Sequence, residues 1–323
     1  MKVGILGAGS IARAMAMAVN GLEGVEGYAV ASRDLSKAQA FCNTWGFQKA
    51  YGSYEEMLQD PQVDLVYVAT PHSHHFEHTR LCIEHGKPAL VEKAFTANAA
   101  QARELIAMAE RKGVFLTEAI WVRYMPSRRI LRELIDSGII GSVQRVSADL
   151  SYPIPNVKRL TDPSLAGGAL LDLGVYVLNF ASMVLGDDVQ EIKGLCTYCD
   201  TGVDCQESIT ITYPDGKMAS LTASMLTASH RLGLIYGTKG YIHCININNI
   251  QGFEVYDLNH NLLKTVEVPK QINGYEYEVL ACKKALEAGA LECPQMPHSE
   301  TIRMMEWMDK LRADWGVRFP FEE

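Results

Sequence analysis

The chain opens with Met1-Lys2-Val3-Gly4-Ile5-Leu6-Gly7-Ala8-Gly9-Ser10-Ile11-Ala12, a short apolar run that glycines interrupt before an alanine-rich stretch. Gly7 allows a tight turn after a first strand, Gly9 lets the backbone approach a pyrophosphate, and Ala12 is small enough for close helix–strand packing. The N–H groups and dipole of the following helix favour an anion. We therefore predict a dinucleotide-binding unit whose pyrophosphate lies against Gly7, Ala8, Gly9, Ser10 and Ile11.

The end of the second predicted strand indicates which dinucleotide is bound. Tyr28-Ala29-Val30-Ala31 is typical of a buried strand, and Ser32 and Arg33 follow where an NAD-binding protein places Asp or Glu on the ribose. A hydroxyl and a guanidinium suit a 2′-phosphate, because Arg forms bidentate charge-assisted bonds with phosphate oxygens. We expect NADP rather than NAD, and interpret Asp34 as the N-cap of a helix over Leu35–Trp45. The alternative is that Asp34 is the ribose acid and Arg33 a solvated loop residue.

Length and composition predict two globular domains, and without a secretory or membrane segment the cytoplasm is the expected location. At 323 residues the chain is about twice a typical domain, and its 48% hydrophobic residues allow each half to bury a core. We place a dinucleotide-binding domain over 1–120 and a substrate-binding and oligomerisation domain over 121–323. A formal net charge of −8 without a basic run argues against a nucleic-acid partner. We find no secretory signal and no apolar run of the ~20 residues of a membrane span, and expect no membrane contact.

The eight cysteines are scattered through predicted strands and helices, which indicates reduced thiols rather than a disulfide framework. Cys196, Cys199 and Cys205 lie close in sequence. A second C-x-x-C or a close histidine pair is missing, so we interpret these thiols as strand residues and expect no metal site.

The first 120 residues alternate apolar strands with helices, which predicts a doubly wound parallel sheet. The central strand Leu65–Ala69 ends in a loop that contains a His-x-His-His tract at 72–75, on the side where such sheets bind ligands. The tract lacks a partnering acid, so we interpret it as part of the cofactor site rather than as a metal site. A helix over Phe76–His85 is expected to follow. The residues assigned to this cofactor loop are Thr70, Pro71, His72 and His75.

From Gln144 onward strands follow one another in series. Eight strand-like segments and only two helices, Gly168–Leu185 and Glu276–Ala288, predict an open, mostly antiparallel sheet with helices on one face. The other face then needs a cover, and a second copy of the chain would supply it, which predicts a homodimer or larger homo-oligomer through this sheet.

Two further motifs bear on function. Val91-Glu92-Lys93 ends a predicted strand, and Gly167-Gly168-Ala169-Leu170-Leu171-Asp172-Leu173-Gly174-Val175-Tyr176 opens a predicted helix. With the glycine pattern at the N-terminus, they resemble the Gfo/Idh/MocA family of glucose-fructose oxidoreductase and inositol dehydrogenase over essentially the whole chain. The stretch Glu118–Tyr124 and the tyrosine at 176, where most relatives have His, are similar to the dimeric dihydrodiol dehydrogenase and aldose dehydrogenase branch. The resemblance implies nicotinamide-dependent oxidation and reduction.

Lys93, Asp172 and Tyr176 are the predicted catalytic residues. Asp172 and Tyr176 lie four residues apart on one predicted helix and therefore share a face. A cleft between the domains would add Lys93 around the same substrate oxygen. A free Tyr titrates near ~10, but a lysine cation and nicotinamide charge favour the phenolate, which makes Tyr176 the general acid/base and Lys93 its activator. Alternatively, Lys93 transfers the proton and Tyr176 positions the substrate.

Each of these residues also has an ordinary structural interpretation: a surface lysine, a helix acid paired with an arginine, and a half-buried aromatic. Their joint occurrence in the family pattern favours the catalytic one. Glu92 is expected to orient the cofactor or Lys93. Trp121 and Arg123, with Tyr176, are predicted to wall the substrate pocket. For Trp121 and Arg123 the alternative is packing between the domains.

These observations predict an NADP-dependent oxidoreductase that transfers a hydride between nicotinamide and a carbon–oxygen centre of a small sugar, polyol or vicinal dihydrodiol. One alternative is an NAD-dependent redox glycosidase of the same fold, against which Arg33 argues. The other is a non-catalytic NADP-binding protein, against which the presence of Lys93 and Tyr176 argues.

Overall fold

The structure is a computed structural model that describes residues 1–322. It divides into two units: Met1–Tyr124 with Gln271–Met305, and Met125–Lys270 with the chain from Glu306 onward. The first boundary lies close to the predicted one at residue 120. Residues 271–305 differ from the expectation, because they belong with the first unit although they follow the second in sequence. Which unit this late segment packs against depends on contacts between residues far apart in sequence, and local composition does not encode those contacts.

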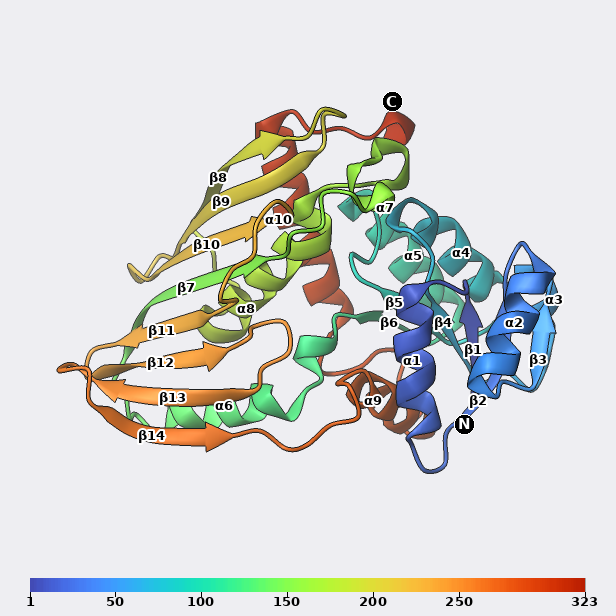
Figure 1. The fold of residues 1–323 in the computed structure, drawn as a ribbon, viewed down its shortest axis with the longest axis horizontal. Coiled ribbons are helices and arrows are strands. Elements are labelled where there is room, and N and C mark those ends of the chain that lie inside the picture. The colour runs from blue at the N-terminus through green and yellow to red at the C-terminus, as the bar shows by residue number, and fades with distance from the viewer. Residues whose placement is uncertain (323) are drawn as a thin grey trace. The chain divides into compact units, whose positions relative to one another are not determined.

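The first unit contains a parallel sheet of six strands among its described residues, in the order β3-β2-β1-β4-β5-β6 (Figure 1). Two further helices come from the later part of the chain, α9 (Glu276–Glu287) and the first half of α10 (His298–Trp315). This arrangement confirms the predicted doubly wound sheet. The remaining elements are β1 (Lys2–Leu6), α1 (Ser10–Asn20), β2 (Glu26–Ala31), α2 (Leu35–Trp45), β3 (Lys49–Tyr51), α3 (Tyr54–Leu58), β4 (Leu65–Val68), α4 (His72–Glu84), β5 (Ala89–Glu92), α5 (Ala99–Lys112), β6 (Leu116–Ala119) and the 3₁₀ turn η1 (Trp121–Arg123).

Capping side chains set the helix starts of this unit. Asp34 accepts from the Ser36 amide at 3.0 Å, Ser53 from the Glu56 amide at 3.1 Å, and Asn98 from the Gln101 amide at 3.0 Å. Helix α4 differs from the prediction, because it begins at His72 rather than at Phe76. Pro71 precedes it with a φ of −63° and no side-chain cap, so the usual sequence signal for a helix start is missing.

The second unit is built on a sheet of eight strands in the described chain, ordered β14-β13-β12-β11-β7-β10-β9-β8 (Figure 1). Neighbouring strands in this sheet run antiparallel, except that β7 and β10 run parallel to each other. This confirms the predicted open, mostly antiparallel sheet. Its elements are α6 (Pro126–Asp136), β7 (Val143–Ser151), α7 (Lys158–Thr161), η2 (Pro163–Leu165), the π-helical turn η3 (Leu170–Gly174), α8 (Val175–Leu185), β8 (Glu191–Tyr198), β9 (Asp204–Thr212), β10 (Met218–Ser224), β11 (Gly233–Gly237), β12 (Gly240–Ile245), β13 (Gly252–Asp257), β14 (Leu262–Glu267), the end of α10, and η4 (Pro320–Glu322).

Helix α8 and the turn η3 pack against the centre of this sheet. Alternate strand residues such as Val146, Ile209 and Leu221 are buried beneath them, whereas Ser208 and Thr222 on the other side are exposed. The sheet therefore has one covered face and one open face, as its strand pattern predicts.

Two expectations about helices and apolar segments need correction. Helices α6 and α10 were not expected, although Pro126 at the first position of α6 and apolar residues at helical spacing in α10 were available signals. The segment Pro163–Leu185 is apolar and long enough to cross a membrane by composition, contrary to the expectation of no such run. Most of this segment is buried inside the fold, as in the core helix of a globular unit.

Candidate active site

The carboxyl ends of β1 and β4, where the strand order reverses, form the predicted dinucleotide edge. Gly7 has a φ of +100°, and a Cβ there would lie 2.9 Å from the carbonyl oxygen of Ala69. A Cβ on Gly9 would meet no atom within 4 Å, so the backbone is open at that point. In the described chain no side chain caps the start of α1, and its first turn holds no acid. Free N–H groups without a competing carboxylate fit a pyrophosphate, which Ser10 and Ile11 at the start of α1 would help to hold.

The end of β2 separates the roles of Ser32, Arg33 and Asp34. The Asp34 carboxylate accepts from both the amide and the hydroxyl of Ser36, which confirms it as the N-cap of α2. The Ser32 hydroxyl accepts from the Asp34 amide at 3.3 Å. Arg33 is exposed, and within residues 1–322 it makes no hydrogen bond or ion pair. Its guanidinium is thus available for an anionic ligand.

Two cations near this edge were not singled out from the sequence. Arg13 and Lys37 line a hollow of about 680 Å³ together with Ala8 of the glycine loop. Lys37 lies four residues after Arg33 at the start of α2, and charge spacing along that segment was the signal that could have found it.

The predicted cofactor loop is tied together by His75. The ring is fully buried, with Nδ1 2.8 Å from the carbonyl oxygen of Ala94 and Nε2 2.7 Å from that of Thr70. Burial lowers the pKa of His75 to about 4, so the neutral ring donates to one of these carbonyls. His72 is also buried, and its ring lies edge-on to His75. The His75 ring therefore joins the segment after β4 at Thr70 to the segment after β5 at Ala94.

Glu92 lies directly beneath the backbone of Lys93. Its carboxylate accepts a short hydrogen bond from the Tyr67 hydroxyl, and its other oxygen accepts from the Lys93 amide at 3.2 Å. Glu92 is 6% exposed, whereas Lys93 is only partly buried. The Glu92 carboxylate thus holds the Lys93 backbone, and its predicted role in orienting the cofactor or Lys93 stays a prediction.

Trp121 and Arg123 have extensive contacts inside the first unit. The Trp121 ring stacks on Tyr275 at 4.3 Å between centroids, and Arg123, which is 3% exposed, pairs with Glu300. Both contacts lie within the first unit, so they do not test the alternative of packing between the domains. Their predicted place in a substrate wall stays a prediction.

The second unit presents Asp172 and Tyr176 from η3 and the first turn of α8. Both side chains are largely buried, at 4% and 7% exposed. The Asp172 carboxylate lies 2.9 and 3.4 Å from two nitrogens of Arg159, whose side chain is 44% exposed. A carboxylate that a guanidinium holds is a weak proton acceptor, so this pair favours a positioning role for Asp172 over direct proton transfer.

The structure offers no metal cluster: among the described residues, no group of three or more His, Cys, Asp or Glu side chains could hold an ion. The eight cysteines are free thiols, of which Cys196 and Cys199 are partly exposed and the rest buried.

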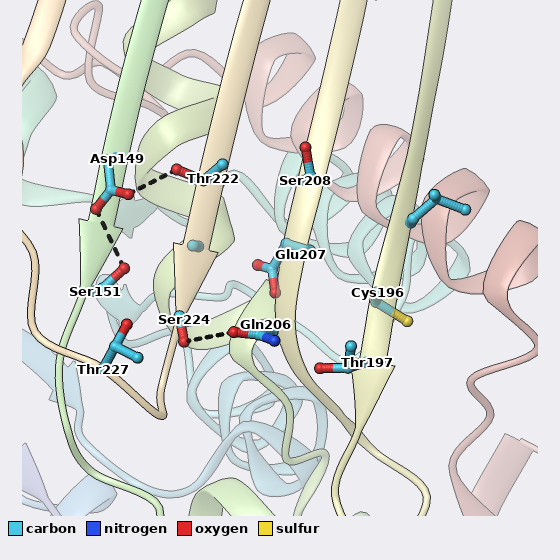
Figure 2. Close-up of a pocket in the computed structure, with 12 residues that line it drawn as sticks. Asp149, Ser151, Cys196, Thr197, Gln206, Glu207, Ser208, Thr222, Ser224 and Thr227 are labelled. Carbon is cyan, nitrogen blue, oxygen red and sulfur yellow. Dashed lines mark hydrogen bonds between the residues drawn. The ribbon is translucent and has the colours of Figure 1, made fainter.

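A groove of about 410 Å³ lies on the open face of the second sheet. Figure 2 shows Asp149, Ser151, Thr222 and Ser208 on neighbouring strands of this face, with the Asp149 carboxylate accepting from the Thr222 hydroxyl at 2.7 Å. Polar side chains and Leu195 line the groove together, and none of the predicted catalytic residues is among its lining residues.

Comparison with known proteins places this arrangement in a family. Residues 1–120 match the family described as "Oxidoreductase family, NAD-binding Rossmann fold", and residues 129–243 match the "GFO/IDH/MocA C-terminal domain". The mouse trans-1,2-dihydrobenzene-1,2-diol dehydrogenase is 34% identical, with 99% of this chain and 98% of the mouse protein covered. The chain belongs to the Gfo/Idh/MocA family of oxidoreductases. The human protein of the same name is 35% identical over 90% of this chain and 89% of its own length.

Solved structures of other oxidoreductases share the fold of this Gfo/Idh/MocA protein. A 3-ketoreductase from Actinomadura kijaniata, solved with NADP and TDP-benzene, is 25% identical with a TM-score of 0.88, and each chain is covered to 97%. An aldose-aldose oxidoreductase from Caulobacter crescentus is 21% identical with a TM-score of 0.86 and 96% of each chain covered. The predicted family and fold are thereby confirmed, and the chain is an oxidoreductase of this family with a Rossmann domain that binds NAD(P).

Proposed function

We propose that this protein is an NADP-dependent oxidoreductase that transfers a hydride between nicotinamide and a carbon–oxygen centre of a small sugar, polyol or vicinal dihydrodiol. The names of the mammalian relatives, trans-1,2-dihydrobenzene-1,2-diol dehydrogenases, and of the aldose-aldose oxidoreductase with the same fold support this substrate class.

Arg33 is the observation that carries the choice of NADP. Its exposed guanidinium stands at the end of β2, and the neighbouring acid Asp34 is engaged as a helix cap instead of facing a ribose. Ser32, Arg33 and Lys37 would hold the 2′-phosphate, and the start of α1 the pyrophosphate. Once bound, nicotinamide supplies the hydride chemistry.

For the proton step we propose Tyr176 as the group that takes the hydroxyl proton during oxidation and returns it during reduction. Lys93 stabilises the phenolate by its positive charge. Asp172 holds Arg159 in place, and that exposed guanidinium supplies hydrogen-bond donors for substrate oxygens. In the alternative assignment, Lys93 transfers the proton and Tyr176 positions the substrate. Variants of both residues distinguish the two assignments.

A panel of aldoses, polyols and trans-dihydrodiols, each with NADP and with NAD, tests the proposed function. We expect NADP reduction, read at the nicotinamide absorbance, with at least one compound that bears a secondary or anomeric hydroxyl, and much slower turnover with NAD. Tight NADP binding without turnover of any member would support a non-catalytic binding protein. Turnover with NAD alone would contradict the proposed cofactor.

We further propose that the open face of the second sheet binds a second copy of the chain. The face exposes apolar area, with Leu195 at 80% exposed, and carries both signs of charge, including Asp149 and Lys193. Opposite charges on one surface allow it to pair with itself across a twofold axis, which buries the same face of both copies. The two helices that were not expected, α6 and α10, leave Leu195 on this face exposed.

Light scattering at micromolar concentration tests the homodimer. We expect about twice the 35.7 kDa of one chain, through an interface above ~2,000 Å² if the association is obligate. Ser208→Arg, in the middle of the open face, should yield monomer. Leu258→Arg, at a residue that is 64% exposed in the turn after β13, should not. A wild-type protein that scatters as a single chain would refute the proposal.

A further inference from the structure

The glycine pair before the predicted catalytic helix has a clear packing role inside the second unit. Gly168 has a φ of +128°, and a Cβ on it would overlap Oδ1 of Asp204. A Cβ on Gly167 would lie 2.5 Å from the carbonyl oxygen of Leu160. Gly168 therefore lets the chain pass close to a buried carboxylate on β9 just before η3, and Gly167 lets it pass close to the backbone of Leu160.

Asp204 makes direct hydrogen bonds to that starting point. Oδ2 accepts from the Leu170 amide at 2.6 Å, and the Ala169 amide also faces the carboxylate. Asp204 is 1% exposed and is the first residue of β9, where it pairs with Tyr198 of the neighbouring strand. The sheet thus fixes the carboxylate, and the carboxylate fixes the first amides of η3.

A second acid of β9, Glu207, packs against the opposite end of η3 without a hydrogen bond to it among the described residues. A Cβ on Gly174 would lie 2.6 Å from Oε1 of Glu207, which is also on β9. Both Glu207 carboxyl oxygens are buried and have no hydrogen-bond partner in the described residues. Burial raises the pKa of Glu207 well above its usual range, which favours the neutral carboxyl. Of these two acids on β9, Asp204 is the one whose carboxylate accepts a hydrogen bond from an η3 amide.

We propose that Asp204 is a positioning residue for the proton step: by holding the Ala169 and Leu170 amides it sets the orientation of η3, and hence the place of Tyr176 six residues later. The inference rests on the proposed role of Tyr176. A negative charge is favourable at the start of a helix, because the free N–H groups there carry partial positive charge. A π-helical turn has a less regular hydrogen-bond ladder than an α-helix, so its direction depends more on such an external contact.

Replacement of Asp204 should lower turnover more than it lowers cofactor binding. Asp204→Ala removes the acceptor, and we expect turnover per folded molecule to fall about tenfold to a hundredfold, the effect of a displacement of about 1 Å at a reacting group. Asp204→Asn keeps one oxygen acceptor and should recover most of the turnover. NADP affinity should stay within about twofold of wild type in both, because the dinucleotide edge belongs to the other unit. Hydrogen exchange should become faster at amides 169–176 in Asp204→Ala.

A matched control separates positioning from a general loss of stability. Asp60 is another buried carboxylate, which accepts from the hydroxyls of Tyr28 and Tyr51 and from Lys49 at 2.6–2.9 Å in the first unit. Asp60→Asn should lower the melting temperature and leave turnover per folded molecule unchanged.

The double variant decides whether Asp204 acts through Tyr176. If it does, Asp204→Ala combined with Tyr176→Phe is about as slow as Tyr176→Phe alone, because the position of residue 176 no longer affects turnover once its hydroxyl is absent. Multiplied losses, wild-type turnover in Asp204→Ala, or unchanged hydrogen exchange at 169–176 would each overturn the inference. Tyr176→Phe with normal turnover would instead show that the proposed proton step is wrong.

Discussion

Tyr176→Phe is expected to lower turnover by ~10² to 10⁴, because it keeps the ring and its packing and removes the only transferable proton. NADP affinity should stay close to wild type, since Tyr176 is in α8 of the second unit. Tyr213→Phe is the control: that hydroxyl is buried and has no hydrogen-bond partner among residues 1–322, so its loss should leave turnover unchanged. Turnover, NADP affinity and melting temperature are measured on the same preparations. A purely structural tyrosine would lower the melting temperature alone.

Lys93→Met separates the two assignments of the proton step. If Lys93 stabilises the phenolate, its loss lowers turnover and raises the pKa seen in the pH profile of oxidation, because the phenolate is then less favoured. The rate at a given pH on the acidic side of the profile should fall accordingly. Near-normal turnover in Tyr176→Phe beside an inactive Lys93→Met would assign proton transfer to Lys93 and leave Tyr176 as a substrate-positioning residue.

Arg33→Ala is expected to weaken NADP binding about tenfold to a hundredfold and to leave NAD binding nearly unchanged. One charge-assisted phosphate contact contributes ~1.5 to 3 kcal/mol to binding. NAD lacks the 2′-phosphate, so its binding does not depend on this contact. Arg33→Lys should be intermediate, because it keeps the charge but not the bidentate geometry. Calorimetric titration of both cofactors measures the effect without any substrate.

Arg80→Ala is the matched control for that titration. Arg80 is half-exposed on α4, where it lies 4.0 Å from Glu84, and its removal takes away one positive charge from the same unit. Both affinities should stay at wild-type values. Equal losses of NADP and NAD in Arg33→Ala, or a wild-type preference for NAD, would contradict the NADP assignment.

Features that depend on neighbours in sequence were predictable from the chain alone. The glycine turn at Gly7 and Gly9, the Asp34 cap and the alternation of the sheet strands are local, because backbone conformation and side-chain direction follow from a few adjacent residues. The parallel sheet, the open antiparallel sheet and the family followed from these patterns.

The tertiary structure decided which polar side chains meet across long separations. It paired Asp172 with Arg159, buried Arg123 against Glu300, returned residues 271–305 to the first unit, and brought Asp204 to the Leu170 amide. None of these contacts leaves a periodic or local signal, since a hydrogen bond between residues 34 positions apart depends on strand order and packing. The sequence by itself determined the chemistry that the chain contains, and only the fold decided which of its charged groups face one another.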